Sequence, residues 1–162
     1  MKRKEKVTEF TTYRLIKNED LNHHLSLFAG FGLSFLVENA FVAAASVCNP
    51  EYLRFIHCSE MSFTSPVHLG EILKLSSRIV HIGNTSITTY VNMSIGTKFC
   101  GDGFLTFVQI RPYETIDEKG EKIIKYTSVP VDVELELLTE EDKQLNEKAI
   151  QLKKNTSHGK RS

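Results

Sequence analysis

The sequence predicts a single α+β domain in which a curved antiparallel sheet of five or more strands wraps around one long buried helix, with a second helix at the C-terminus. Two observations predict this fold class. Residues 28–47 form one long apolar stretch, and four or more strand-like segments joined by short turns follow it. Because short turns connect antiparallel strands, these segments are expected to form one sheet, whose concave face the helix must fill.

The apolar stretch predicts a buried helix and not a membrane span. Between Phe28 and Val47, 14 of the 20 residues are apolar, and they fall on every side of a 3.6-residue period. Glu38 and Asn39 lie near the middle of this stretch, where a carboxylate in lipid would cost about 2.5 kcal/mol or more. We therefore expect a helix that is covered on all sides, in a soluble protein without a membrane segment.

Two features of this helix suggest more than packing. Gly30 and Gly32 occupy its first turn, where unpaired N–H groups and the positive end of the helix dipole face outward. That is a suitable place to hold a developing oxyanion, although the glycines could equally serve only to let another backbone approach closely. Glu38 is a carboxylate on a helix with hardly any polar face, and such a group is usually paired, exposed at a seam or functional.

The strands up to residue 95 are predicted from β-branched residues, alternation and turns. The predicted strands are residues 7–16, 53–63, 72–82 and 85–95. Alternation within the second of them places His57 on its more apolar face, where it reads as a core histidine. Gly83-Asn84 predicts a tight hairpin between the last two strands.

The remainder of the chain is predicted from turns and helix caps. A turn at residues 101–103 should lead into a strand over residues 104–110, which Pro112 closes, and residues 131–138 read as extended or irregular. Thr139 is expected to cap a helix over residues 139–154, because acids occupy its first turn and lysines its last. We therefore expect one domain over residues 1–138, followed by this C-terminal helix. Residues 155–162 include no hydrophobic residue and should be disordered.

Composition narrows the class of protein. Lys plus Arg and Asp plus Glu both number 20, and no basic stripe with interleaved aromatic residues suggests a nucleic-acid partner. The basic N-terminus is followed by a polar, alternating segment, which is unlike a signal peptide. The cysteines Cys48, Cys58 and Cys100 lack metal-ligand spacing, and the adjacent His23 and His24 read as loop residues and not as metal ligands. We expect a cytoplasmic protein with free, partly buried thiols and no metal.

Five short motifs occur in order along the chain. They are DLNHH at residues 20–24, LFAG at 27–30, MSFTSPVHLG at 61–70, GNTS at 83–86 and DEKG at 117–120. With them, residues 15–126 resemble the hotdog-fold acyl-CoA thioesterases of the broad-specificity acyl-CoA hydrolase type. The resemblance implies the hotdog fold and hydrolysis of an acyl-CoA thioester by water to free acid and coenzyme A. It also implies a homodimer, or a dimer or trimer of such dimers, with active sites at the seam and no cofactor apart from the coenzyme A of the substrate.

The resemblance also implies roles for individual residues. Asn22 would orient the water or hold the carbonyl, the Gly30 N–H would bind the oxyanion, and an acid midway along the helix of the neighbouring subunit would act as base or nucleophile. Simple geometry agrees, because Gly30 and Glu38 are eight residues apart, about 12 Å along one helix. If both residues take part, a second copy must supply one of them.

Substrate contacts follow from the same resemblance. The motifs place His23, Phe28 and Phe63 where they would contact the substrate, and we expect the phosphates of the coenzyme near Thr85 and Ser86.

One position departs from the family pattern. Where the family usually has the catalytic aspartate, this chain has Val37, and Glu38 follows one residue later, rotated by about 100° around the helix. Either Glu38 substitutes through its longer side chain and a small shift of the helix, or the usual base is missing. The alternative function is therefore a catalytically weak hotdog module that binds acyl-CoA or acyl-carrier protein. A dehydratase of the same fold would want a histidine and aspartate pair at the helix start, and this helix has no histidine.

Overall fold

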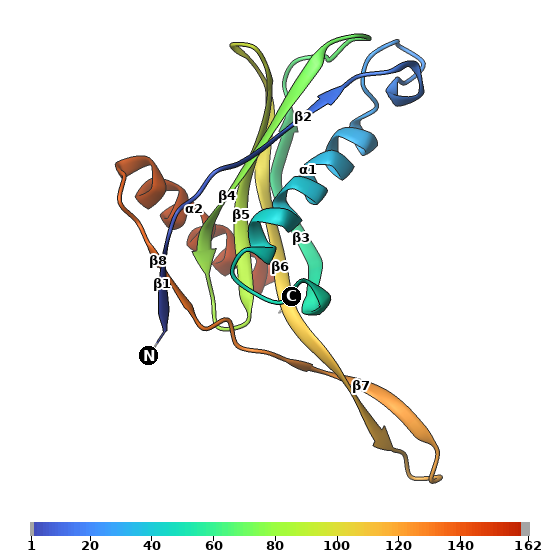
Figure 1. Cartoon of the computed structure of the whole chain (residues 1–162), viewed down its shortest axis with the longest axis vertical. Coiled ribbons are helices and arrows are strands. Elements are labelled where there is room, and N and C mark those ends of the chain that lie inside the picture. The colour runs from blue at the N-terminus through green and yellow to red at the C-terminus, as the bar shows by residue number, and fades with distance from the viewer. Residues whose placement is uncertain (1, 160–162) are drawn as a thin grey trace.

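A computed structural model describes residues 2–159 and confirms the predicted α+β fold (Figure 1). Six strands form a curved antiparallel sheet in the order β2-β4-β5-β6-β3, with β7 paired to one end of β6. The elements are β1 (Arg3–Lys6), β2 (Phe10–Leu15), α1 (Ala29–Ala45), β3 (Leu53–Phe63), β4 (Ile72–Ile82), β5 (Ser86–Ile95), β6 (Lys98–Ile116), β7 (Lys122–Ser128), β8 (Val133–Glu136) and α2 (Glu140–Gly159). A short 3₁₀ turn at Asn18–Asp20 lies between β2 and α1, and another at Pro50–Tyr52 lies between α1 and β3.

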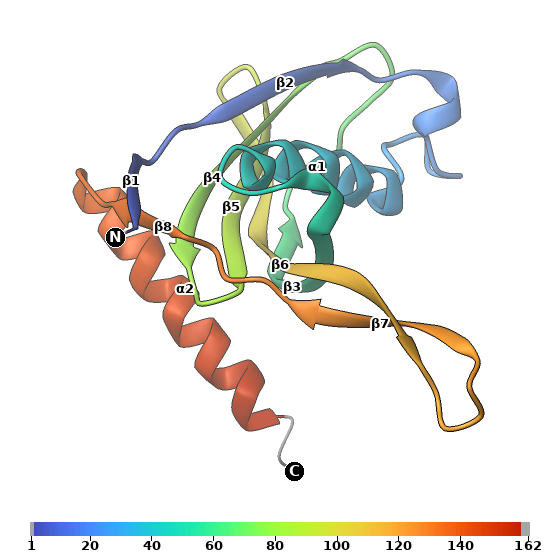
Figure 2. The ribbon, with the colours of Figure 1, turned by 60° about the horizontal axis from the view of Figure 1, so that its bottom comes forward.

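The main core lies between α1 and the concave face of the sheet (Figure 2). Leu36, Ala40, Ala43 and Ala44 of α1 are fully buried, and the small alanine side chains let the helix lie close to the strands. A second, smaller cluster lies between the other face of the sheet and α2. It contains Val80, Phe104 and Ala149, with Tyr90, Leu145 and Leu152 packed against it. The sheet is therefore covered by one helix on each face.

The expectation that α1 is covered on all sides is wrong for a single protomer. Phe31 and Val42 are 41% and 53% exposed, and Glu38 lies on the same open stripe of the helix. The sheet curves around only part of the helix, so its outermost side chains have no strand above them. None of the helices within residues 2–159 is long and apolar enough to span a membrane.

The turn predicted at Gly101 and Gly103 is wrong, because both residues lie inside β6. The hairpin between β5 and β6 turns instead at Gly96, whose φ of +56° favours glycine. The two glycines in β6 allow β3 to approach closely. A Cβ at position 101 would clash with the Ser62 carbonyl oxygen, and one at position 103 would lie 2.6 Å from Met61 Cε.

This close approach can be tested by adding one methyl group. We expect Gly101→Ala to lower the free energy of unfolding by about 1–3 kcal/mol, because the backbone of β3 would have to move. Lys98→Ala, at the exposed start of the same strand, should change it by less than about 0.5 kcal/mol. Denaturant unfolding of both variants measures the difference, and equal stabilities would mean that β3 and β6 are not packed as described.

Strand β3 does not follow the simple alternation that the sequence predicted. Its pairing with β6 shifts register between Phe55 and His57, so that Ile56 and His57 both line the side facing α2. Phe55 points to the opposite side, where its ring lies 5.7 Å from that of Phe107 in the core. The interpretation of His57 as a core histidine is therefore wrong, and the bulge in β3 is the reason.

Strand β6 does not end at Pro112 but continues to Ile116 and pairs with β7. We call this projecting β6–β7 hairpin, residues 110–128, the arm (Figures 1 and 2). Within the arm, β6 has β7 as its single neighbour, and such an edge tolerates proline.

Residues 131–138 were predicted to be extended or irregular, and part of this segment is extended. The segment at residues 131–138 contains β8, which pairs in parallel with β1. Helix α2 runs to Gly159, so the disorder predicted for residues 155–162 is wrong for residues 155–159, and the rest of that prediction lies outside the described residues. The last turn of α2 is held because Thr156 Oγ1 donates to Leu152 O at 3.0 Å and lies 3.4 Å from His57 Nε2.

Candidate functional site

The first turn of α1 presents two backbone N–H groups that are free to bind an anionic oxygen. Phe28 is the N-cap residue, and its side chain makes no capping hydrogen bond. The N–H groups of Phe31 and Gly32 both donate to Phe28 O, at 3.0 and 3.1 Å. Within residues 2–159, those of Ala29 and Gly30 have no acceptor. Such a helix start favours negative charge.

The ring of Phe28 lies against the backbone of Gly30. A Cβ at position 30 would lie 2.5 Å from Phe28 Cε1, so glycine leaves the space that the ring fills. The same ring meets that of Phe31 edge-on, with 5.3 Å between the centroids. Phe28 is 48% exposed, and its outer face is therefore available to a ligand held at the helix start.

Asn22 organises the loop before α1. Its Oδ1 accepts hydrogen bonds from His24 N–H at 2.8 Å and from Ser26 N–H at 3.3 Å, and its own N–H donates to Ser26 O at 2.7 Å. The N–H of Phe28 in turn donates to Asp20 O at 2.9 Å, which ties this loop to the helix start. Because Oδ1 is occupied, Nδ2 is the part of Asn22 that can meet a ligand, and no acceptor for it lies within the described residues.

Phe63 reaches the same end of α1 from β3. Its ring would lie 3.3 Å from a Cβ at Gly32, and together with Ala29 it lines a cavity of about 240 Å³. The structure therefore brings Asn22, Phe28, the first turn of α1 and Phe63 into one region. His23 is exposed in the same loop, and its ring lies 3.9 Å from that of His24. In the described part of the chain, no three His, Cys, Asp or Glu side chains cluster as metal ligands.

Glu38 lies in a different place on the protomer. It is exposed and lines a cavity of about 220 Å³ together with Thr12 and Arg14 of β2. The Arg14 guanidinium stacks on the Phe35 ring, 3.8 Å from its centroid, and forms one wall of this cavity. Val37 is half-buried and packs against the core instead. One protomer thus separates Glu38 from the free amides of α1.

Sequence reasoning missed the role of Asn39, the residue after Glu38. Asn39 is 3% exposed, and its Nδ2 donates to Thr12 Oγ1 at 2.9 Å and to Leu75 O at 3.3 Å. The backbone carbonyl oxygen of Asn39 accepts a hydrogen bond from Ser77 Oγ at 3.1 Å. The side-chain Oδ1 of Asn39 is buried and has no donor within residues 2–159. Asn39 therefore fixes α1 to β2 and β4. Its position beside the glutamate in an otherwise apolar helix was the available signal.

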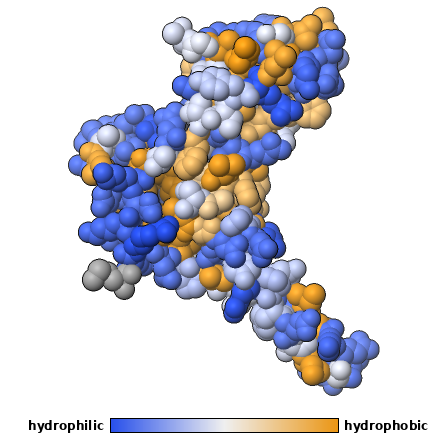
Figure 3. Space-filling view, in the orientation of Figure 1, coloured by the Kyte–Doolittle hydropathy of each residue, from blue (hydrophilic) through white to orange (hydrophobic). Residues whose placement is uncertain are grey.

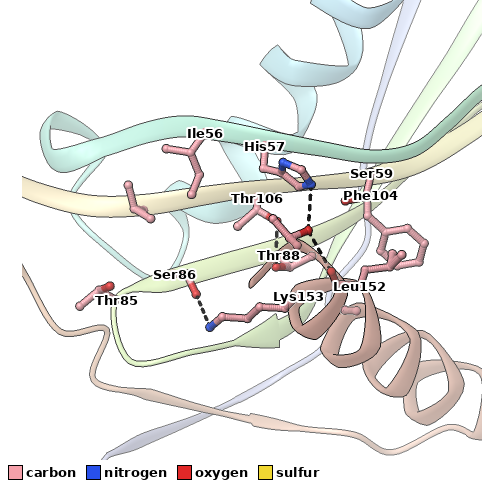
Figure 4. Close-up of a pocket in the computed structure, with 13 residues that line it drawn as sticks. Ile56, His57, Ser59, Thr85, Ser86, Thr88, Phe104, Thr106, Leu152 and Lys153 are labelled. Carbon is pink, nitrogen blue, oxygen red and sulfur yellow. Dashed lines mark hydrogen bonds between the residues drawn. The ribbon is translucent and has the colours of Figure 1, made fainter. Parts of the chain in front are cut away.

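Thr85 and Ser86 lie far from the start of α1 in the protomer. Thr85 O accepts from the N–H of Gln109, whose side chain in turn accepts from the N–H of Asn49, just beyond the C-terminal end of α1. Thr85 and Ser86 line a third cavity, of about 470 Å³, under α2 (Figure 4). The structure therefore places the predicted phosphate contacts and the predicted catalytic residues in separate regions of one protomer.

The cysteines are poor candidates for nucleophiles. Burial raises the pKa of the Cys48 thiol to about 11, and it also raises the pKa values of Cys58 and Cys100. Thiolates are therefore scarce near neutral pH, and the chemistry of the site rests on the amides and polar groups described above.

Comparison with known proteins identifies the fold. A family described as the thioesterase superfamily matches residues 27–98, which include α1 and the strands β3, β4 and β5. A crystal structure of an apo-hexameric acyl-CoA thioesterase superposes with a TM-score of 0.78 at 26% identity, over 96% of each chain. The chain therefore has the hotdog fold, and its residues 27–98 match the thioesterase superfamily.

Other structures share this hotdog fold at lower identity. The acyl-CoA hydrolase of Staphylococcus aureus, solved with butyryl coenzyme A, coenzyme A and coenzyme A disulfide, matches with a TM-score of 0.72 at 18% identity, over 96% of this chain and 90% of that one. The acyl-CoA hydrolase of Bacillus cereus matches with a TM-score of 0.73 at 22% identity, over 94% and 88%. Alanine variants of the S. aureus hydrolase at an aspartate, an asparagine and a threonine have the same fold. No curated protein sequence matches the chain significantly.

Proposed function

We propose that this protein is an acyl-CoA thioesterase, which hydrolyses the thioester to a free acid and coenzyme A. The observation that carries the proposal is the pair of unpaired N–H groups at the start of α1, in a chain with the fold of acyl-CoA thioesterases. A thioester carbonyl is already electrophilic and a thiolate leaves readily. The site therefore mainly needs oxyanion stabilisation, an oriented water and a base. The reaction needs no cofactor apart from the coenzyme A of the substrate.

In the proposed mechanism the Gly30 N–H donates to the thioester carbonyl oxygen, which gains negative charge as water attacks. Asn22 Nδ2 holds the carbonyl or the water in line. Glu38 of a second copy accepts the proton of the attacking water, and the tetrahedral intermediate then expels the coenzyme A thiolate. Glu38 is the single carboxylate on α1, and its exposure leaves it able to reach a neighbouring protomer.

The proposed site requires a homo-oligomer, since Gly30 and Glu38 lie on different parts of one protomer. Exposed apolar side chains on the outer face of α1 support such an assembly (Figure 3). The apo-hexameric acyl-CoA thioesterase with this fold is one such assembly. A hexameric thioesterase from Yersinia pestis is another, and it matches with a TM-score of 0.57 at 18% identity over 69% of this chain and 90% of that one. We propose a homodimer with two shared sites, as such or within a larger assembly in the cytoplasm, where its free thiols would stay reduced.

The arm offers a test of assembly. Ile116, Ile124 and Tyr126 lie on one face of this hairpin and are 60–67% exposed. Because an isolated two-stranded hairpin is marginally stable, we expect this face to pack on a second copy. The double variant Ile116→Lys/Ile124→Lys should lower the molar mass measured by light scattering by at least one assembly step.

The matched control places lysines on the opposite face of the arm, as Thr115→Lys/Thr127→Lys, and should keep the mass of the wild type. A wild-type mass for the first variant at equal concentration would mean that the arm does not hold the assembly together.

Release of free thiol from a panel of acyl-CoA esters of increasing chain length tests the proposed activity. We expect hydrolysis of at least one class of acyl-CoA by the wild type. A protein that binds acyl-CoA tightly but releases no thiol from any of them would contradict the proposal. The half-buried Val37, at the position where the family usually has its aspartate, would then explain a binding module.

A further inference from the structure

The largest of the three cavities described above lies on the opposite face of the sheet from α1, between the strands and α2 (Figure 4). Its volume is about 470 Å³, within the range of pockets that hold small molecules. Strands β3, β5 and β6 form its floor, and the last turns of α2 form its roof. The proposed hydrolysis uses no part of α2, so this cavity needs an explanation of its own.

One end of the cavity is built around an ammonium group. Lys153 Nζ donates to Ser86 Oγ at 3.2 Å, and Ser86 is only 7% exposed. A Cβ at Gly83 would lie 2.6 Å from both Lys153 Nζ and Ser86 Oγ, so glycine leaves room for this pair. The hairpin between β4 and β5 thus provides both the space and a hydrogen-bond acceptor for the Lys153 ammonium.

The floor beside this charge carries hydroxyl groups that can donate as well as accept. Thr88 Oγ1 and Thr106 Oγ1 lie 3.1 Å apart, so one of these two hydroxyls keeps its proton for a ligand. On the roof, the Thr156 hydroxyl already donates to Leu152 O. No Asp or Glu occurs among the described residues that line the cavity. An anion placed here would therefore meet the Lys153 ammonium together with the hydroxyl groups of Ser86 and the two threonines.

The remainder of the wall is apolar, formed by Ile56, Phe104, Val108, Ala149 and Leu152. These side chains cannot pair with a second charge. A multiply charged phosphate compound, which is usually held by several cations or by the planar fork of arginine, fits such a wall poorly. The combination suits a ligand with one negative charge at one end and an apolar body.

The positive charge of Lys153 also affects His81, which does not line the cavity. Burial lowers the pKa of His81, and the nearby Lys153 ammonium lowers it further. His81 therefore offers a spectroscopic probe of whether an anion has neutralised Lys153.

We propose that this cavity binds a small organic carboxylate, with its carboxylate at Lys153 and Ser86 and its aliphatic chain against Phe104 and Leu152. The ligand is defined by one negative charge and a short apolar chain. The inference depends on this cavity alone and goes beyond the proposed function, because the cavity is separate from the helix start where hydrolysis is placed.

Titration calorimetry with octanoate tests the proposal on the full chain. We expect saturable binding to the wild type and about 10-fold or more weaker binding to Lys153→Met, which keeps the aliphatic stem and removes the charge. The matched control Lys154→Met removes the neighbouring lysine, which does not line the cavity, and should bind like the wild type. The NMR titration of His81 should move to higher pH on adding octanoate to the wild type and stay in place in Lys153→Met.

Three results would overturn the proposal. They are no binding of octanoate at millimolar concentration, equal affinity of the wild type and Lys153→Met, and Lys153-dependent binding of coenzyme A that displaces octanoate. The second result would locate octanoate elsewhere, and the third would assign the cavity to the phosphates of the coenzyme. Thiol release by the wild type is measured separately, because a failure of hydrolysis and a failure of octanoate binding are independent.

Discussion

Gly30→Pro is expected to lower kcat for acyl-CoA hydrolysis by about 100- to 1,000-fold, the usual cost of removing one oxyanion donor. Proline lacks the N–H that the proposed mechanism uses, and that N–H makes no hydrogen bond within the described residues. The first turn of a helix tolerates proline, because no intrahelical bond is lost there. Steady-state kinetics of thiol release measure the effect.

Gly30→Ala is the matched control. Both substitutions place a Cβ where the Phe28 ring now lies, so both displace that ring, but alanine keeps the N–H. We expect the alanine variant to retain kcat within about 10-fold, since it keeps the donor whose loss is costly. Equal losses in the two variants would assign the effect to the displaced ring and contradict the role of the amide. Circular dichroism and thermal unfolding confirm that α1 is intact in both.

Much of this fold could be predicted because its strongest signals are local. The continuous apolar stretch that becomes α1 and the Gly83-Asn84 hairpin between β4 and β5 each depend on a few neighbouring residues. The errors arose where a distant strand decides the conformation. Gly101 looks like a turn residue in the sequence, but it is required by the carbonyl of Ser62 on β3. The bulge that turns His57 toward α2 depends in the same way on the pairing of β3 with β6.

In the candidate site, too, the sequence could predict only the residues that lie close together along the chain. Asn22 and Gly30 belong to one short segment around the start of α1, so the sequence could nominate them together, and the structure shows what each backbone or side-chain group is free to do. The positions of Glu38, Ser86 and Gly30 relative to one another depend on the curvature of the sheet and on a second copy. The cavity at Lys153 depends on where α2 docks, which no local pattern encodes.

Glu38→Gln is expected to lower kcat by about 100- to 10,000-fold, the usual contribution of a positioned general base. Glutamine keeps the size of the side chain but cannot accept the proton of the attacking water. Glu38 is exposed, so the free energy of unfolding should change by less than about 0.5 kcal/mol, and the loss can be assigned to chemistry. Wild-type kcat in this variant would show that Glu38 is not the base.

Mixing the two inactive variants tests whether the site is shared between protomers. In a hybrid dimer of Gly30→Pro and Glu38→Gln chains, one site combines the intact Gly30 of one chain with the intact Glu38 of the other, while the second site carries both defects. Random pairing makes half of the dimers hybrid, so about a quarter of wild-type activity should return when the chains are refolded together, as expected for a two-fold symmetric interface. If both residues act within one protomer, every chain carries one defect and no activity returns. The recovery therefore depends on the separation of Gly30 and Glu38 in the protomer, which is the reason that a second copy is required.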